Sequence, residues 1–150
     1  MVNKTDPCPV AATLRLVGEA WTLLIVREAF FGTRRFADFQ RRLGIARNIL
    51  SDRLGKLTRH GILRRVPVAP GARRHEYRLT RKGLDLLPML VAMAQWGERW
   101  LHEEGGGIRL VDRRDRLPIR PVRVRAADGR ELNAHEIAVE FDVDHPPGEG

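Results

Sequence analysis

Two short amphipathic segments followed at once by a β-prone pair constrain the fold of this chain more than any other feature. Residues 34–44 and 46–60 each place their apolar side chains on one helical stripe, and Gly44 and Ile45 supply a tight turn between them. Residues 62–68 and 75–79 are β-prone, and the turn signal Pro70-Gly71 lies between them. A helix-turn-helix followed directly by a β-hairpin predicts a winged helix.

The apolar spacing predicts which residues face the core of this domain. The expected core positions of the two motif helices are Phe36, Phe39 and Leu43 in the first and Ile49, Leu50, Leu54 and Leu57 in the second. Two earlier helices are expected. The first covers residues 8–18 and has Val10, Leu14 and Val17 on one side. The second covers residues 19–32; its core side chains are expected to be Trp21, Leu24, Ile25 and Ala29, and Arg27 and Glu28 lie at the flank. These helices complete a small helical core.

A long helix is predicted over residues 81–104, with Thr80 as its N-cap and a kink at Pro88. Its apolar residues form two adjacent stripes: Leu84, Leu87, Val91, Ala94 and Leu101, and beside them Leu86, Leu90, Met93, Gly97 and Trp100. A small domain covers only one such stripe, so the other is expected to face a second subunit. The predicted interface consists of Val10, Leu14, Leu90, Met93, Gly97, Trp100 and Leu101.

The sequence changes character after the glycines at 105–107. Val122, Val124 and Ala126 alternate with arginines, Asp128-Gly129 is a tight-turn signal, and Ile137, Val139 and Phe141 alternate with polar residues. We therefore predict a winged helix-turn-helix and dimerisation domain over residues 1–104 and a β-hairpin-like appendage over residues 105–150 that ends in a disordered tail. The expected fold class is mainly α with a β wing (α+β).

The charge is concentrated in the motif. Residues 33–82 carry 15 lysines and arginines against three acids, a local net charge of +12 in a chain of net charge +8. A single-sign block of this size is typical of nucleic-acid binding, although a solvated basic surface is the alternative. No apolar run reaches the length of a membrane span and the N-terminus lacks a secretory signal, so a cytoplasmic protein without a membrane partner is expected.

Several short motifs, taken in order, resemble one known family. They are "CPV" at 8–10, Trp21, "RRFADFQRRL" at 34–43, "LSDRLGKLTRHGILRR" at 50–65, "YRLTRKG" at 77–83 and "LPML" at 87–90 with Trp96 downstream. The chain is similar over residues 7–101 to the HxlR-type transcriptional regulators, a winged-helix branch close to the MarR-like proteins. The resemblance implies a dimeric bacterial DNA-binding regulator whose N-terminal and fifth helices build the dimer.

The second motif helix then carries the candidate base-reading side chains, with Asn48, Ser51 and Asp52 opposite its apolar stripe and Arg47 and Lys56 at the edges of that side. Arg53 lies closer to the apolar side and is predicted to be a structural ion-pair residue, or a phosphate contact near the helix axis, rather than a base reader. Candidate phosphate contacts are Arg35, Arg59, Arg64, Arg65, Arg73, Arg74 and His75. Ala46 stands where the family often has serine, so this helix is expected to lack a capping hydroxyl.

Cys8 is the single cysteine and occupies the position of the family's near-N-terminal cysteine, which is a thiol sensor in some redox-sensing relatives. A helix start stabilises a thiolate, which favours reactivity, and the alternative is a packed, inert thiol. A small-molecule effector is a further candidate partner.

No catalytic motif is present, and the five histidines lack metal-ligand spacing, so no enzyme activity, cofactor or metal is expected. The leading hypothesis is a sequence-specific transcriptional regulator, a repressor, that binds a palindromic operator in double-stranded DNA as a homodimer and responds to an effector or to a thiol reaction. The alternatives are a nonspecific architectural nucleic-acid-binding winged helix and a small-molecule-binding regulator with altered DNA function.

Overall fold

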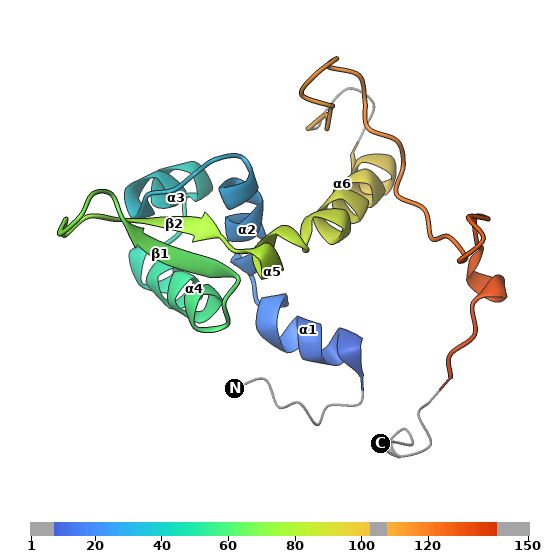
Figure 1. Cartoon of the computed structure of the whole chain (residues 1–150), viewed down its shortest axis with the longest axis horizontal. Helices are drawn as coiled ribbons and strands as arrows, with labels where there is room; N and C mark the ends of the chain where they lie inside the picture. Colours follow the sequence, from blue (N-terminus) through green and yellow to red (C-terminus); the bar gives the residue numbers. More distant parts are fainter. Residues whose placement is uncertain (1–7, 103–107, 141–150) are drawn as a thin grey trace. The chain divides into compact units, whose positions relative to one another are not determined.

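The computed structural model describes residues 8–102 and 108–140 (Figure 1). Its internal contacts separate two compact units, Met1–Leu87 and Pro88–Gly150, which are described in turn. The sequence-predicted boundary at residues 104 and 105 lies outside the described residues and stays a prediction. The first unit is a winged helix-turn-helix.

The residues at their ends set the limits of the first two helices. Helix α1 (Pro9–Val17) has proline in its first turn and ends at Gly18, whose N–H donates to Leu14 O over 2.7 Å. Helix α2 (Thr22–Phe30) begins after Trp21, which adopts a left-handed φ of 74° that is unusual for a bulky residue. Ile25 and Ala29 are buried as predicted, whereas Leu24 is 39% exposed. The predicted core face of α2 is therefore only partly correct.

The helix-turn-helix occupies the predicted segments. Helix α3 (Phe36–Leu43) ends at Gly44 with a φ of 64°, a conformation that glycine adopts without strain. Helix α4 (Arg47–Arg59) has Ala46 as its N-cap and no side-chain cap hydrogen bond, which confirms the missing hydroxyl. The fully buried side chains of the two helices are Phe39, Leu50, Leu54 and Leu57. Helical periodicity therefore located this core.

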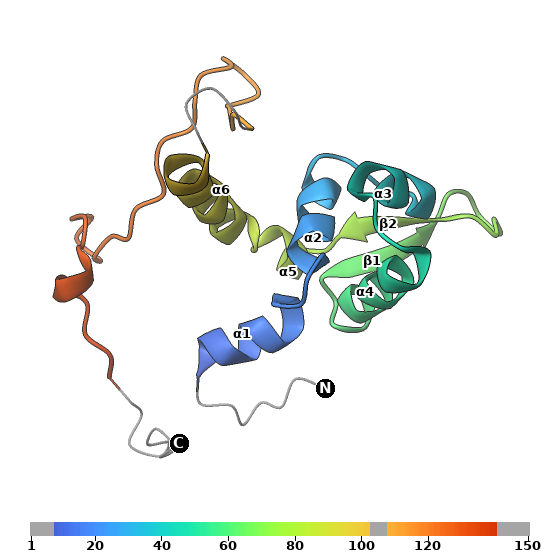
Figure 2. The same cartoon turned by 180° about the vertical axis from the view of Figure 1, so that it is seen from behind.

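The wing is a two-stranded antiparallel sheet of β1 (Leu63–Pro67) and β2 (His75–Leu79), paired from Leu63–Leu79 to Pro67–His75. Tyr77 anchors it to the helices, because its N–H donates to Arg34 O over 2.8 Å and its ring meets the Phe39 ring edge-on with centroids 6.4 Å apart. The loop between the strands extends beyond α3 and α4 in both views (Figures 1 and 2).

The helix predicted over residues 81–104 is interrupted in its described part, close to the kink expected at Pro88. Helix α5 (Arg81–Leu84) is one turn, and α6 (Leu87–Leu101) starts after a break at Asp85 and Leu86. Pro88 explains the break: proline has no N–H to give Leu84 O and its ring would collide with the preceding turn, so it is tolerated only at a helix start.

Thr80 caps α5 as predicted, and it also joins α5 to the chain that follows α4. Its Oγ1 accepts from Gly83 N at 3.1 Å and donates to Gly61 O at 2.5 Å, while its backbone N–H donates to Ile62 O at 3.0 Å. Lys82 Nζ adds a hydrogen bond of 2.9 Å to His60 O. Gly83 permits this approach, because a Cβ there would lie 2.3 Å from Ile62 O.

The second unit contains α6 and residues 108–140, and the predicted β appendage is partly correct for its described part. No strand forms there, but the chain pairs antiparallel across the predicted turn, since the Leu132 N–H donates to Val124 O and the Ala126 N–H to Arg130 O, both over 2.9 Å. Only isolated bridges form, at Val111–Pro118 and Arg125–Glu131, together with a 3-10 turn η1 (Ala134–Glu136). The expected turn at Asp128-Gly129 is present, since Gly129 has a φ of 88°. At the turns that begin at Asp112, Asp115 and Asp128, the aspartate side chain accepts a hydrogen bond from the backbone N–H two residues later. Phe141 and the predicted disordered tail lie outside the described residues.

Within residues 8–102 and 108–140, no single helix has the length and apolar character of a membrane span; only α1 and α2 taken together pass that test, and they are bent by 80°.

Candidate nucleic-acid interface

Helix α4 presents a polar face to solvent. Arg47, Asn48, Ser51 and Asp52 are all exposed and recur at the spacing of one helical face. The Arg47 guanidinium carbon lies 5.1 Å from the centre of the Phe36 ring, which holds that side chain across the start of the helix. The face therefore combines side chains that can pair with adenine and guanine edges.

Lys56 and Arg53 instead tie α4 to the end of α1. Lys56 pairs with the Glu19 carboxylate and donates to Arg15 O over 2.9 Å, and its side chain is 18% exposed. Arg53 pairs with Glu19 at 2.7 Å and with Asp52, as the sequence predicted for a structural ion pair. The hydrogen bond from Lys56 lowers the pKa of Glu19. Lys56 can read a base only after leaving these partners.

The wing concentrates arginine on an exposed sheet. Arg64 and Arg78 are directly paired across the strands, Arg65 is opposite Tyr77, and Arg73 and Arg74 occupy the loop, all five arginines being exposed. Like charges directly opposite one another are unfavourable. Glu76, the sole acid of residues 62–79, offsets this by pairing with Arg78 at 3.0 Å and with Arg35 at 3.9 Å.

The other expected phosphate contacts flank the wing and α4. Arg35 is the exposed N-cap of α3, and Arg59 is exposed at the end of α4. His75 is half-buried, with its Nδ1 2.9 Å from Arg73 O. Burial lowers the pKa of His60 at the end of α4, and the charges of Lys82, Lys56 and Arg59 lower it further, because this end of the helix is already positive.

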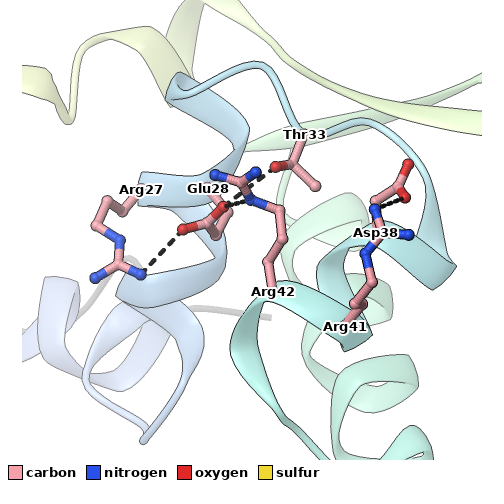
Figure 3. A network of polar contacts seen from close by, with 6 residues as sticks. All are labelled: Arg27, Glu28, Thr33, Asp38, Arg41 and Arg42. Atoms are coloured by element: carbon pink, nitrogen blue, oxygen red, sulfur yellow. Dashed lines mark hydrogen bonds and ion pairs between the residues drawn. The ribbon is translucent and has the colours of Figure 1, made fainter.

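A buried carboxylate positions the helix-turn-helix, and the sequence analysis missed it. Glu28 was expected at the flank of α2, yet it is 4% exposed and accepts from Arg42 Nε at 2.6 Å, Arg27 Nη2 at 3.0 Å and Thr33 Oγ1 at 3.2 Å (Figure 3). Burial alone would raise the pKa of Glu28, but the hydrogen bonds from Arg42 and Arg27 lower it overall. The ion pair with Arg42, fourteen positions along the chain, fixes α3 on α2.

The residues expected at a dimer interface are accessible within their own units. Val10 is 66% and Leu14 57% exposed on α1. On α6, Met93, Trp100 and Leu101 are exposed, and Leu90 and Gly97 are half-buried. Cys8 is exposed at the N-cap of α1. In the part of the chain that the structure describes, no group of three metal-binding side chains occurs.

Comparisons with known proteins agree with this geometry. An uncharacterised HTH-type transcriptional regulator of Mycobacterium tuberculosis (strain ATCC 25618 / H37Rv) is 52% identical over 102 residues, which are 67% of this chain and 65% of that protein. The crystal structure of PA1607, a proposed transcription factor, matches with 44% identity and a TM-score of 0.88 over 95% of this chain and 100% of that chain. The redox regulator HypR in its reduced form matches with 30% identity and a TM-score of 0.57 over 63% of this chain and 96% of that chain.

The model of the HxlR-like helix-turn-helix matches residues 16–105, which include α2 to α6 and the whole wing. The chain therefore belongs to the HxlR-like helix-turn-helix family.

Proposed function

We propose that the protein is a sequence-specific DNA-binding transcriptional regulator, a repressor, that binds a palindromic operator as a homodimer in the cytoplasm. One observation carries the proposal: the exposed polar face of α4 and the exposed arginines of the wing belong to the same unit. The face offers hydrogen-bonding groups for base edges, and the wing offers charge for the phosphates beside them.

In this proposal α4 enters the major groove. Asn48 can make paired hydrogen bonds with adenine, Arg47 with guanine, and Ser51 with a base or a phosphate. The wing arginines neutralise phosphates and release counterions, which gives affinity without sequence preference. Specificity is therefore assigned to α4, and most of the salt dependence to the wing.

The homodimer is supported by the apolar side chains that α1 and α6 leave exposed. Two α4 helices related by a two-fold axis would bind half-sites about 34 to 36 Å apart. Leu90→Asp on α6 should place a charge in the interface and give monomers that bind a full operator weakly. Light scattering and operator titration measure both effects, and a wild-type mass equal to one chain at micromolar concentration would contradict the homodimer.

Sequencing the genomic DNA fragments that the purified protein retains tests the sequence-specific function. A shared two-fold symmetric site, competed by its own duplex and not by unrelated duplex or RNA, is the expected result. Equal competition by all three would instead support the nonspecific architectural alternative. A reporter joined to the recovered site, in cells with and without the protein, then tests the repressor assignment.

A further inference from the structure

The second unit has many apolar side chains and no core of its own among its described residues. None of those residues, in α6 or in the segment 108–140, is buried. Trp96 is 58%, Trp100 63% and Val124 57% exposed. Ordering a chain costs conformational entropy that apolar burial normally offsets, so these surfaces require a cover.

Gln95 fastens the segment 108–140 to α6. Its side-chain Nε2 donates to Arg120 O over 3.1 Å, and its Oε1 accepts from Val122 N at 2.8 Å. The side-chain amide thus bonds one backbone carbonyl and one backbone N–H of the segment, two residues apart. The segment is thereby held at a defined place along the helix.

The helix and the fastened stretch border a hollow of about 500 Å³ that is open to solvent. Its wall includes Trp96 and Trp100 from α6 and Ile119 and Val122 from the segment. Val122 is 41% exposed. The apolar groups of helix and segment therefore form one surface rather than separate patches.

We propose that this surface is covered by the same surface of a second copy of the chain, so that the segment 108–140 acts as a dimerisation arm and Gln95 as its positioning residue. The inference rests on the proposed homodimer and extends it beyond the family-matched residues 16–105. A two-fold axis brings the same surface of each copy face to face, so that apolar side chains of one copy meet apolar side chains of the other. The match to PA1607 covers 95% of this chain, so it includes most of the arm.

The charges of the arm favour a protein partner over nucleic acid. Residues 108–140 carry eight arginines and six acids, in contrast to the strongly basic motif. Several of these arginines already have acidic partners: Arg125 pairs with Glu131 at 3.1 Å, and Arg130 pairs with Asp128 at 3.3 Å. A surface with interspersed charges of both signs can match a copy of itself, whereas phosphate binding needs unpaired positive charge.

Sedimentation equilibrium of the 150-residue chain tests whether residues 108–140 contribute to the dimer. Gln95→Ala removes both bonds to the arm, and Val122→Asp places a charge on its apolar surface; each should raise the dimer dissociation constant at least about tenfold. Val68→Asp is the matched control, because Val68 in the wing is 44% exposed and receives the same change. The control should keep the wild-type dissociation constant.

Hydrogen exchange of the wild-type protein provides a second measurement that needs no variant. Backbone amides of the arm, Val122 among them, should exchange more slowly above the dissociation constant than below it, while wing amides stay unchanged. If neither variant changes the dimer dissociation constant, and hydrogen exchange in the arm does not depend on protein concentration, the proposed role of the arm is wrong and the homodimer still stands. A wild-type monomer at every concentration would overturn both, and a monomer that carries a bound small molecule in native mass spectrometry would make the hollow a ligand site instead.

Discussion

The Nε atom of Arg42 in α3 lies 2.6 Å from the Oε2 atom of Glu28 in α2, and the Glu28 side chain is 5% exposed. Arg41 and Asp38 form an ion pair of the same length on the same helix, but their side chains are 75% and 36% exposed (Figure 3). The two pairs differ chiefly in burial, so they form a natural comparison.

Glu28→Gln should lower the free energy of unfolding at pH 7 by about 1 to 3 kcal/mol, because it leaves Arg42 and Arg27 without their buried charge partner. Asp38→Asn, the control, should cost less than about 1 kcal/mol because its pair is exposed. Urea unfolding of both variants measures the difference. Equal costs for the two would show that the buried pair does not hold α3.

The same carboxylate makes stability depend on pH. The pKa of Glu28 is lowered in the folded protein from an ordinary value of 4.5, so its contribution is fully present above that value and is lost as the pH falls through the lower folded pKa. Wild type and Glu28→Gln should therefore converge in stability on the acid side. A constant difference from pH 7 down to pH 3 would contradict this.

Arg73→Ala and Arg74→Ala should each weaken binding to every DNA sequence and reduce the slope of log affinity against log salt by about one unit. Both arginines are exposed in the loop of the wing. Fluorescence anisotropy at several salt concentrations measures the slope, and Arg113→Ala, an exposed arginine of the second unit, serves as control. An unchanged slope in the double variant would place the wing away from the phosphates.

Asn48→Ala and Ser51→Ala should relax base preference at particular operator positions, at a cost of about 1 to 3 kcal/mol where a base contact is lost. Lys56→Ala provides a contrast, since Lys56 is held by Glu19 and Arg15 O and should change affinity without altering preference. Binding to a set of single-base operator variants distinguishes the two patterns. Uniform weakening by the Asn48 and Ser51 variants would assign them to phosphates.

Cys8 is exposed, and it is the single cysteine of the chain, so any thiol-based switch must act through it. Diamide or a quinone should change the operator affinity of the native protein, through a disulfide between subunits or an adduct, and leave Cys8→Ser unaffected. Mass spectrometry identifies the product. The same response in both proteins, or none with an unreactive thiol, would make Cys8 structural.

Local patterns were sufficient to predict the helix-turn-helix and the wing. Leu50, Leu54 and Leu57 repeat at helical spacing, and Pro70-Gly71 separates two β-prone stretches. These elements form from near neighbours in the chain, so their signal is contained in short windows.

Long-range contacts explain what the sequence did not reveal. The burial of Glu28 depends on Arg42, fourteen residues away, and Lys56 is drawn from the expected reading face by Glu19, which lies between α1 and α2. In the second unit the turn at Asp128-Gly129 formed as predicted, but the pairing stops at a single bridge, because alternation at Ile137 and Val139 does not indicate whether a partner strand exists.

The hydrogen bonds of Thr80 have a mechanical consequence. They join the chain leaving α4 to the start of α5, and Lys82 reinforces this joint at His60 O. A displacement of α5 must therefore move the end of α4 or break the joint. The N–H groups of Asp85 and Leu86 still donate to Arg81 O at 3.1 Å and Gly83 O at 3.2 Å, and the helical ladder is interrupted at Pro88, which has no N–H to donate. A bend at Pro88 can therefore occur without breaking the joint between α5 and the chain that leaves α4, whereas a displacement of α5 cannot.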